Sequence, residues 1–178
     1  MEINFKIALA HILKSEGGFQ DDLMDSGNKL SDGRKGCTNL GVTQTAWEAY
    51  VGHKVSTADM KSLTPEKVAS FYKHKYWDVV HGDDLPSGID YIAFDFAINA
   101  GPGRALKTLQ TALGVTADGA MGPKTLHVIK ASDTKELINK YTKAKETFYR
   151  NLPSFDIYGK GWLARTDAVD ATAKTLIG

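Results

Sequence analysis

Three carboxylates near the N-terminus have the types and spacing needed for acid–base chemistry. Glu16 is followed by Gly17 and Gly18 and then by a stretch that contains Asp22 and Asp25, with eight residues between Glu16 and Asp25. Glycosidic hydrolysis requires one protonated carboxyl group and one ionised carboxylate on either side of the bond between two sugars. A carboxylate pair of this kind is therefore a candidate for a glycosidase, provided that the two groups lie in different environments.

The first predicted helix, from about Asn4 to Ser15, must position Glu16. Apolar residues recur on it at steps of three and four and form one stripe: Phe5, Ala8, Leu9, Ile12 and Leu13. Glu16 is the next position on this stripe, and Gly17 is placed to end the helix. Desolvation and the negative end of the helix dipole both favour a protonated carboxyl group there. This environment suits a general acid, although a glutamate at a helix end is more often a solvated surface residue.

The loop after Glu16 would supply the second group. Residues 17–41 contain glycines and aspartates with little hydrophobic periodicity, which predicts a long loop with a short β-hairpin. In this polar setting Asp25 would stay ionised and could orient water or stabilise the transition state. Acidic glycine-rich loops also bind calcium, but a loop counted from Asp21 or Asp25 lacks the glutamate of an EF-hand at its twelfth position.

Other catalytic and metal-binding patterns are missing from the sequence. The five histidines have no paired ligand spacing, so we expect no zinc site. Cys37, the single cysteine, has no catalytic-histidine signature near it, and no phosphate-binding or dinucleotide-binding glycine motif occurs. We therefore expect neither a metal ion nor another cofactor.

Length and composition predict one globular domain. The chain has 178 residues, of which 42% are hydrophobic and 24% charged, and its net charge of +1 does not indicate nucleic-acid binding. A monomer is expected. No stretch has the length of a transmembrane helix, so we expect no stable membrane insertion. Polar residues interrupt the N-terminal apolar run, which predicts synthesis in the cytoplasm without a signal peptide.

The charge is unevenly distributed along the chain. Counting Lys and Arg against Asp and Glu, residues 1–103 have a net charge of −4 and residues 104–165 a net charge of +6. This asymmetry suits an anionic polymer that lies across the molecule, although solvated faces of ordinary helices give the same pattern.

Helix signals recur along the rest of the chain. They predict helices from Gln44, from Pro65, over Ile89–Ala100, from Pro102, from Pro123, from Ser132-Asp133 to about Asn151 and from about Lys160 to Leu176. The helix Ile89–Ala100 is apolar almost all round, which predicts a central buried helix. On it Asp95 and Asn99 lie one turn apart, and a buried polar pair of this kind is most often structural. The predicted fold is a mainly α single domain of about eight helices with a small irregular or β-hairpin lobe.

Two blocks of residues together resemble a known family. The first is Glu16-Gly17-Gly18-Phe19, then the Asp-containing loop, then Thr38-Asn39-x-Gly41-Val42-Thr43. The second contains Phe94–Ala105, Leu109-Gln110-x-x-Leu113-Gly114-Val115 and Asp118-Gly119-x-x-Gly122-Pro123. In this order they resemble glycoside hydrolase family 108, which consists of N-acetylmuramidases, many of them bacteriophage endolysins. The second block resembles the family's companion peptidoglycan-binding region, and the match spans about residues 5–150.

The resemblance implies a fold and an activity. The fold would be lysozyme-like, with residues 1–178 in one unit that combines a catalytic part (about 1–80) and a peptidoglycan-binding-like helical part (about 85–150). The activity would be cleavage of the β-1,4 bond between N-acetylmuramic acid and N-acetylglucosamine, with Glu16 as the catalytic acid.

The loop departs from the family's pattern. The family's loop is usually shorter and reads Asp-Pro-x-Asp-Pro-Gly-Gly, whereas this chain has an insertion around Asn28–Cys37. The second catalytic group is therefore open among Asp22, Asp25 and a water held by Thr38 or Thr43.

The resemblance also indicates substrate contacts. The residues expected to contact substrate are Asp22, Thr38, Asn39, Thr43 and Asn99, the last because the family's Asn-x-Gly turn falls there.

The expected partner is the glycan strand of peptidoglycan. The resemblance to endolysins further implies action on the bacterial cell wall after release, a role in host lysis, an antimicrobial effect and a separate holin-type pore. Two alternatives stay open: a lytic transglycosylase, which also uses one glutamate, and a non-catalytic wall-binding module, which residues 109–126 alone would permit.

Overall fold

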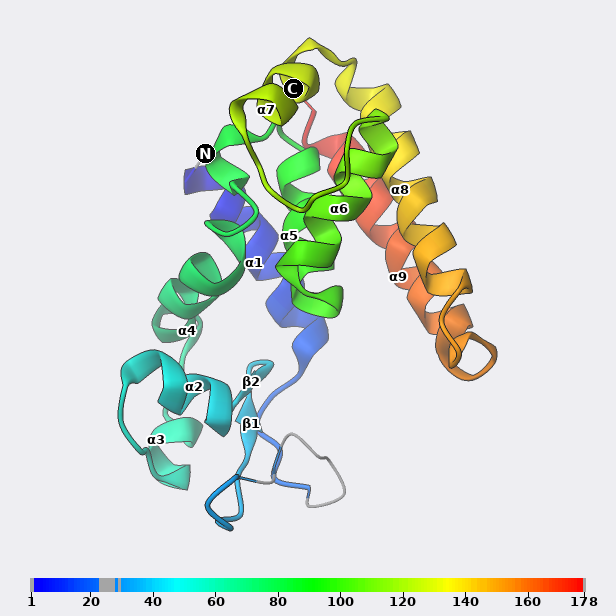
Figure 1. Cartoon of the computed structure of the whole chain (residues 1–178). Helices are drawn as coiled ribbons and strands as arrows, with labels where there is room; N and C mark the ends of the chain where they lie inside the picture. Colours follow the sequence, from blue (N-terminus) through cyan, green and yellow to red (C-terminus); the bar gives the residue numbers. More distant parts are fainter. Residues whose placement is uncertain (1, 23–27, 29, 178) are drawn as a thin grey trace. The chain divides into compact units, whose positions relative to one another are not determined.

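The computed structural model describes residues 2–22, 28 and 30–177 (Figure 1). Asp25, one of the two predicted catalytic carboxylates, lies outside the described residues. Backbone contacts divide the chain into two compact units. The large unit consists of Met1–Ala8 and Tyr76–Gly178, and the small unit of Leu9–Lys75.

The small unit contains the only strands among the described residues. Its elements are the end of α1 (Glu2–Glu16), β1 (Thr38–Asn39), β2 (Val42–Thr43), α2 (Gln44–Val51), α3 (Thr57–Lys61) and α4 (Pro65–Tyr72). β1 and β2 pair in antiparallel register, Thr38 with Thr43 and Asn39 with Val42. A π-helical turn, Lys73–Trp77, follows α4.

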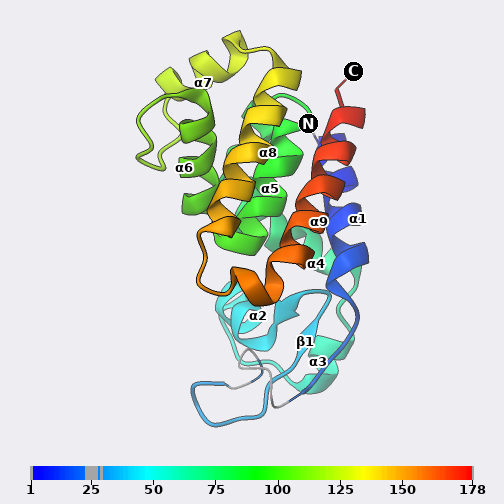
Figure 2. The same ribbon diagram turned by 90° about the vertical axis from the view of Figure 1, so that its right-hand side faces the viewer.

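The large unit is helical. After a 3₁₀ turn (Gly82–Asp84) it contains α5 (Ile89–Ala100), α6 (Pro102–Leu113), α7 (Pro123–Ala131), α8 (Thr134–Arg150) and α9 (Phe155–Thr175). Figure 2 shows α5, α6, α8 and α9 side by side, and α5 packs against the other three. No helix of the described residues is long and apolar enough to cross a membrane.

Local capping signals account for several helix starts. The side chains of Thr43, Thr64 and Asp133 each accept a backbone N–H of the helix that follows them, as the sequence predicts. The predicted fold class, mainly α with a small β-hairpin, is confirmed. The short helix α3 was not predicted, although Ser56 and Asp59 form a capping box at its start.

The start of the last helix was predicted wrongly. α9 begins at Phe155 rather than at about Lys160, so residues 155–159 form its first part. Gly159 is buried inside this helix, and a Cβ there would lie only 2.6 Å from Cδ2 of Phe155. Glycine therefore stands at this position because it leaves room for the Phe155 ring one turn earlier, and it does not break the helix.

The core of the large unit surrounds α5. Phe94 packs edge-on against Trp77, and Phe96 does so against Phe148 and Tyr149. The Phe96 contacts join α5 to α8 and the Phe94 contact joins it to the π-helical turn, and the predicted central position of Ile89–Ala100 is confirmed within this unit.

One buried ion cluster crosses this core. Asp95 accepts from Lys145 at 2.6 Å through Oδ2 and from Arg165 at 2.8 Å through Oδ1, which links α5 with α8 and α9. The side chains of Asp95 and Lys145 are 2% and 1% exposed. Asn99 donates to the Asp95 backbone carbonyl instead, so Lys145 and Arg165, which bind the Asp95 carboxylate, come from other helices.

Candidate active site

Glu16 is the last residue of α1, where the apolar stripe predicts it. Ile12, one turn earlier, is buried, and the Glu16 side chain is half-buried. Gly17 follows with φ +72°, a left-handed conformation that ends the helix. The Glu16 carboxyl group therefore lies at the junction between α1 and the loop that follows it.

The β1–β2 turn lies directly against this carboxyl group. Leu40 and Gly41 form the two-residue turn with φ of 50° and 74°, the sign required at both positions of a type I′ hairpin. A Cβ placed on Gly41 would lie 2.8 Å from Oε2 of Glu16 and 2.6 Å from the hydroxyl oxygen of Tyr72. Only glycine fits here, and the backbone of the turn forms one wall beside Glu16.

Tyr72 fixes the turn in this position. It is 2% exposed, and its hydroxyl group donates to the Leu40 carbonyl at 2.9 Å. Tyr72 is not among the site residues that the sequence predicts. Its apolar spacing on α4 gives no signal of a hydroxyl beside Glu16, because the contact joins distant parts of the chain.

The segment after Glu16 is paired with β1. Gln20 and Thr38 exchange backbone hydrogen bonds of 2.8 Å in both directions. Asn28 is fully buried; it accepts from the Thr38 hydroxyl at 3.0 Å and donates to the Asp22 carbonyl at 2.8 Å. These bonds hold the backbone of Asp22 to the sheet while its side chain is exposed.

The other predicted residues of the hairpin anchor it to neighbouring helices. Thr43 accepts from the Ala46 N–H at 3.2 Å as the cap of α2. Asn39 is buried and donates to the Met60 carbonyl in α3 at 2.8 Å. Glu16, Asp22, Thr38, Asn39 and Thr43 therefore belong to one unit, whereas Asn99 is an exposed residue of the large unit.

A bidentate ion pair supports the same lobe. Arg34 donates to both carboxylate oxygens of Glu48, at 2.9 Å and 2.8 Å, and the Val55 N–H donates to Glu48 at 3.0 Å. Hydrogen bonds from Arg34 and Val55 lower the pKa of Glu48 to about 2. The loop after Asn28 is thereby tied to α2.

Among the described residues, no group of three or more His, Cys, Asp or Glu side chains is arranged to hold a metal ion. In the small unit the carboxyl group of Glu16 is bordered by the backbone of Gly41, and the paired strands beside it carry the hydroxyls of Thr38 and Thr43.

Both the sequence and the structure of this chain are similar to those of known proteins. The sequence model of Glycosyl hydrolase 108 matches residues 9–101, and that of a predicted peptidoglycan domain matches residues 104–167. The comparison with curated proteins gave no match.

A solved structure agrees with these matches over almost the whole chain. The structure of SagA from Brucella abortus is similar with a TM-score of 0.83 and 38% sequence identity, covering 99% of this chain and 97% of that one. The mainly α, lysozyme-like fold that the sequence predicts is therefore confirmed. The chain belongs to glycosyl hydrolase family 108 and is a glycoside hydrolase that degrades peptidoglycan.

Proposed function

We propose that this hydrolase cleaves the β-1,4 bond between N-acetylmuramic acid and N-acetylglucosamine, with Glu16 as the general acid. The observation that supports this role is the position of the Glu16 carboxyl group against the Gly41 backbone at the end of α1. Because the Gly41 backbone lies against one side of the Glu16 carboxyl group, this group has a defined orientation toward a bound sugar. Glu16 gives its proton to the glycosidic oxygen as the bond breaks.

The second group stabilises the positive charge that develops on the sugar or delivers water. Asp22 and Asp25 are the candidate carboxylates, and Thr38 and Thr43 are the candidate holders of a water molecule. Thr38 donates its proton to Asn28 and keeps its oxygen lone pairs as acceptors. Thr43 accepts the Ala46 N–H and keeps its own proton for donation. The two hydroxyls are thus complementary toward one water.

The experiment that tests the assignment is the clearing of a peptidoglycan suspension by Glu16→Gln. Loss of a general acid costs about 10²–10⁴-fold in rate, so clearing should fall by at least that lower factor. Glu66→Gln is the matched control, because Glu66 is an exposed glutamate at the start of α4. Clearing by Glu16→Gln at the rate of the control would refute the role of Glu16.

The products distinguish hydrolysis from transglycosylation. Addition of water leaves hydrated reducing ends on N-acetylmuramic acid, whereas a transglycosylase leaves anhydro-sugars that are lighter by one water. Mass spectrometry of the released muropeptides should find the hydrated form. Reducing ends on N-acetylglucosamine would show that the other β-1,4 bond is cleaved.

We also propose an endolysin role, with synthesis in the cytoplasm, a monomeric state and release through a separate holin-type pore. It is supported by the resemblance to endolysins among the family's N-acetylmuramidases. Expression in a bacterial host should leave cells intact until a holin is co-expressed and should then lyse them. Lysis of equal speed without the pore would contradict this route, and light scattering would check the monomer.

A further inference from the structure

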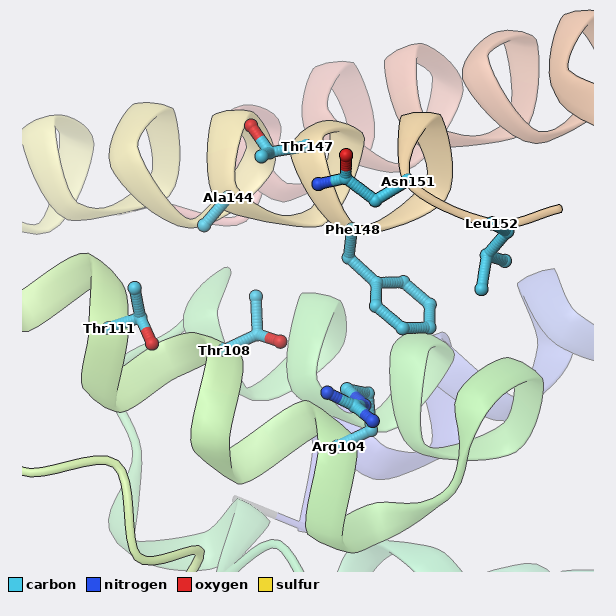
Figure 3. A pocket seen from close by; sticks show the side chains of 8 residues that line it. All are labelled: Arg104, Thr108, Thr111, Ala144, Thr147, Phe148, Asn151 and Leu152. Carbon is cyan, nitrogen blue, oxygen red and sulfur yellow. The ribbon is translucent and has the colours of Figure 1, made fainter. Parts of the chain in front are cut away.

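The large unit has a groove between α6 and α8 that the chemistry at Glu16 does not use (Figure 3). Its volume is about 460 Å³, within the range of sites for small ligands. Residues that line it are Arg104, Thr108, Ala144, Phe148, Asn151 and Leu152. All of them fall within residues 104–167, the part that matches a predicted peptidoglycan domain.

One end of the groove presents a cation. The guanidinium group of Arg104 lies over the ring of Phe148, 5.0 Å from its centroid. The Arg104 side chain makes no hydrogen bond or ion pair within the part of the chain that the structure describes. The Phe148 ring keeps the guanidinium plane in place. The five N–H donors of the guanidinium group suit a carboxylate. Because Arg104 covers this face of Phe148, the face is closed to stacking by a sugar.

The floor of the groove presents a hydroxyl group. Thr108 is 8% exposed, and its hydroxyl has no hydrogen-bond partner among the described residues. Two neighbouring threonines behave differently: Thr111 and Thr147 each donate to a carbonyl one turn earlier at 2.9 Å. Figure 3 shows the Thr108 hydroxyl inside the groove on the side that faces Phe148. No buried side-chain oxygen of the described residues lacks a partner, so the Thr108 hydroxyl is open to the groove and has a hydrogen bond to offer to a ligand amide.

The remaining walls combine apolar and amide groups. Ala144 and Leu152 offer methyl-sized contacts, and Asn151 at the end of α8 offers an exposed amide. A ligand that matches this lining has a carboxylate, peptide amides and small apolar side chains. In peptidoglycan these groups belong to the short peptide stems, whereas unsubstituted glycan offers hydroxyl and acetamido groups. The net charge of +6 over residues 104–165 also favours an acidic peptide.

We propose that the α6–α8 groove binds the peptide stem of peptidoglycan, with a stem carboxylate on Arg104 and a stem amide on the Thr108 hydroxyl. This inference rests on the proposed function, because both concern the same polymer. It deepens that function by assigning recognition of the peptide to the large unit and leaving bond cleavage to Glu16.

The test is calorimetric titration of the full chain with the soluble peptide L-Ala-γ-D-Glu-meso-diaminopimelate-D-Ala. The dissociation constant should rise at least tenfold in Arg104→Gln and severalfold in Thr108→Val, which keeps the side-chain shape. Arg150→Gln is the matched control: Arg150 also lies over a phenylalanine, 5.6 Å from the Phe155 centroid, but does not line the groove. Its affinity should equal that of the wild type. Equal affinity of Arg104→Gln and wild type would overturn the proposal, as would binding of peptide-free chitotetraose at Arg104 in place of the peptide.

A second comparison separates this proposal from the proposed function. Glu16→Gln should bind the peptide like the wild type and fail to clear peptidoglycan. If it clears normally while peptide binding still depends on Arg104, the role of Glu16 is wrong and the groove assignment stands. If it is inactive and Arg104→Gln binds peptide normally, the groove assignment is wrong and the catalytic assignment stands. Circular dichroism melting of each variant shows whether it is folded.

Discussion

Glu16 and Gly41 lie so close together that the turn accepts no side chain. A Cβ on Gly41 would come within 2.8 Å of Oε2 and 3.0 Å of Cβ of Glu16. Gly41 also has φ +74°, which side chains disfavour, so space and backbone conformation both select glycine. The hairpin thereby limits where the carboxyl group can point.

Gly41→Ala should reduce peptidoglycan clearing at least tenfold, because the added methyl group must displace the Glu16 carboxyl group or the turn. Gly52→Ala is a matched control for the backbone effect alone. Gly52 has φ +79° but nothing within 4 Å of a Cβ. Both variants should lose about 1–2 kcal/mol of folding free energy from the strained conformation, measured by urea unfolding. Equal activity of the two variants would show that the contact with Glu16 does not matter.

Tyr72→Phe should lower activity and stability together. It removes the hydrogen bond to Leu40 and leaves a carbonyl of the turn without that donor, a loss of about 1–3 kcal/mol.

Tyr141→Phe provides the comparison for this variant, because Tyr141 donates to the Ala105 carbonyl at 2.8 Å in the core of the large unit. It should lose similar stability and keep its activity at a temperature where both variants are folded. Activity loss of the same size in both would mean that stability alone is responsible.

Local sequence signals predicted much of the small unit and little of its tertiary contacts. The stripe that ends at Glu16, the hairpin around Gly41 and the cap at Thr43 are local patterns, and the structure has all three. The hydroxyl of Tyr72 on the turn was not predictable, because its partner Leu40 lies on another element and periodicity does not identify partners.

In the large unit, too, local elements were predictable and tertiary contacts were not. The sequence identified α5 and the two polar residues on it, but not that Asp95 is paired with Lys145 and Arg165 from later helices. It also gave no reason to single out Thr108, whose missing hydrogen bond is visible only in three dimensions. The start of α9 was predicted five residues too late, because a glycine such as Gly159 that makes room for a ring looks, in sequence, like a glycine that ends a helix.

The Arg34–Glu48 pair should make the stability of the small unit depend on pH in the acid range. The pKa of Glu48 falls from 4.5 to about 2 on folding, so the unfolded chain binds more protons between these values. Stability from this pair is therefore present above about pH 4.5 and is lost as the pH falls toward about 2.

Glu48→Gln isolates this contribution, because glutamine is uncharged at every pH. Its melting temperature should lie well below that of the wild type at pH 6, and the difference should shrink as the pH is lowered through this window. The comparison between the two proteins is needed because Asp90, buried and with a raised pKa, changes stability in the opposite direction. A difference that is independent of pH would contradict the assignment to Glu48.

Asp95→Asn should strongly destabilise the large unit, because it leaves the buried Lys145 ammonium without its carboxylate. Breaking one partner of a buried pair costs roughly 3–5 kcal/mol, whereas replacing both with apolar or neutral groups costs much less. Burial already lowers the pKa of Lys145, against the opposing effect of Asp95. Without Asp95 the pKa of Lys145 should be lowered further, so the stability loss of Asp95→Asn should shrink as the pH rises and Lys145 loses its proton.

The double variant Asp95→Asn with Lys145→Met, in which the methionine packs beside Phe96, should recover most of the lost stability in a double-mutant cycle followed by urea unfolding. If the two single losses simply add, Asp95 and Lys145 are not energetically coupled, and the aromatic contacts of α5 account for the core by themselves.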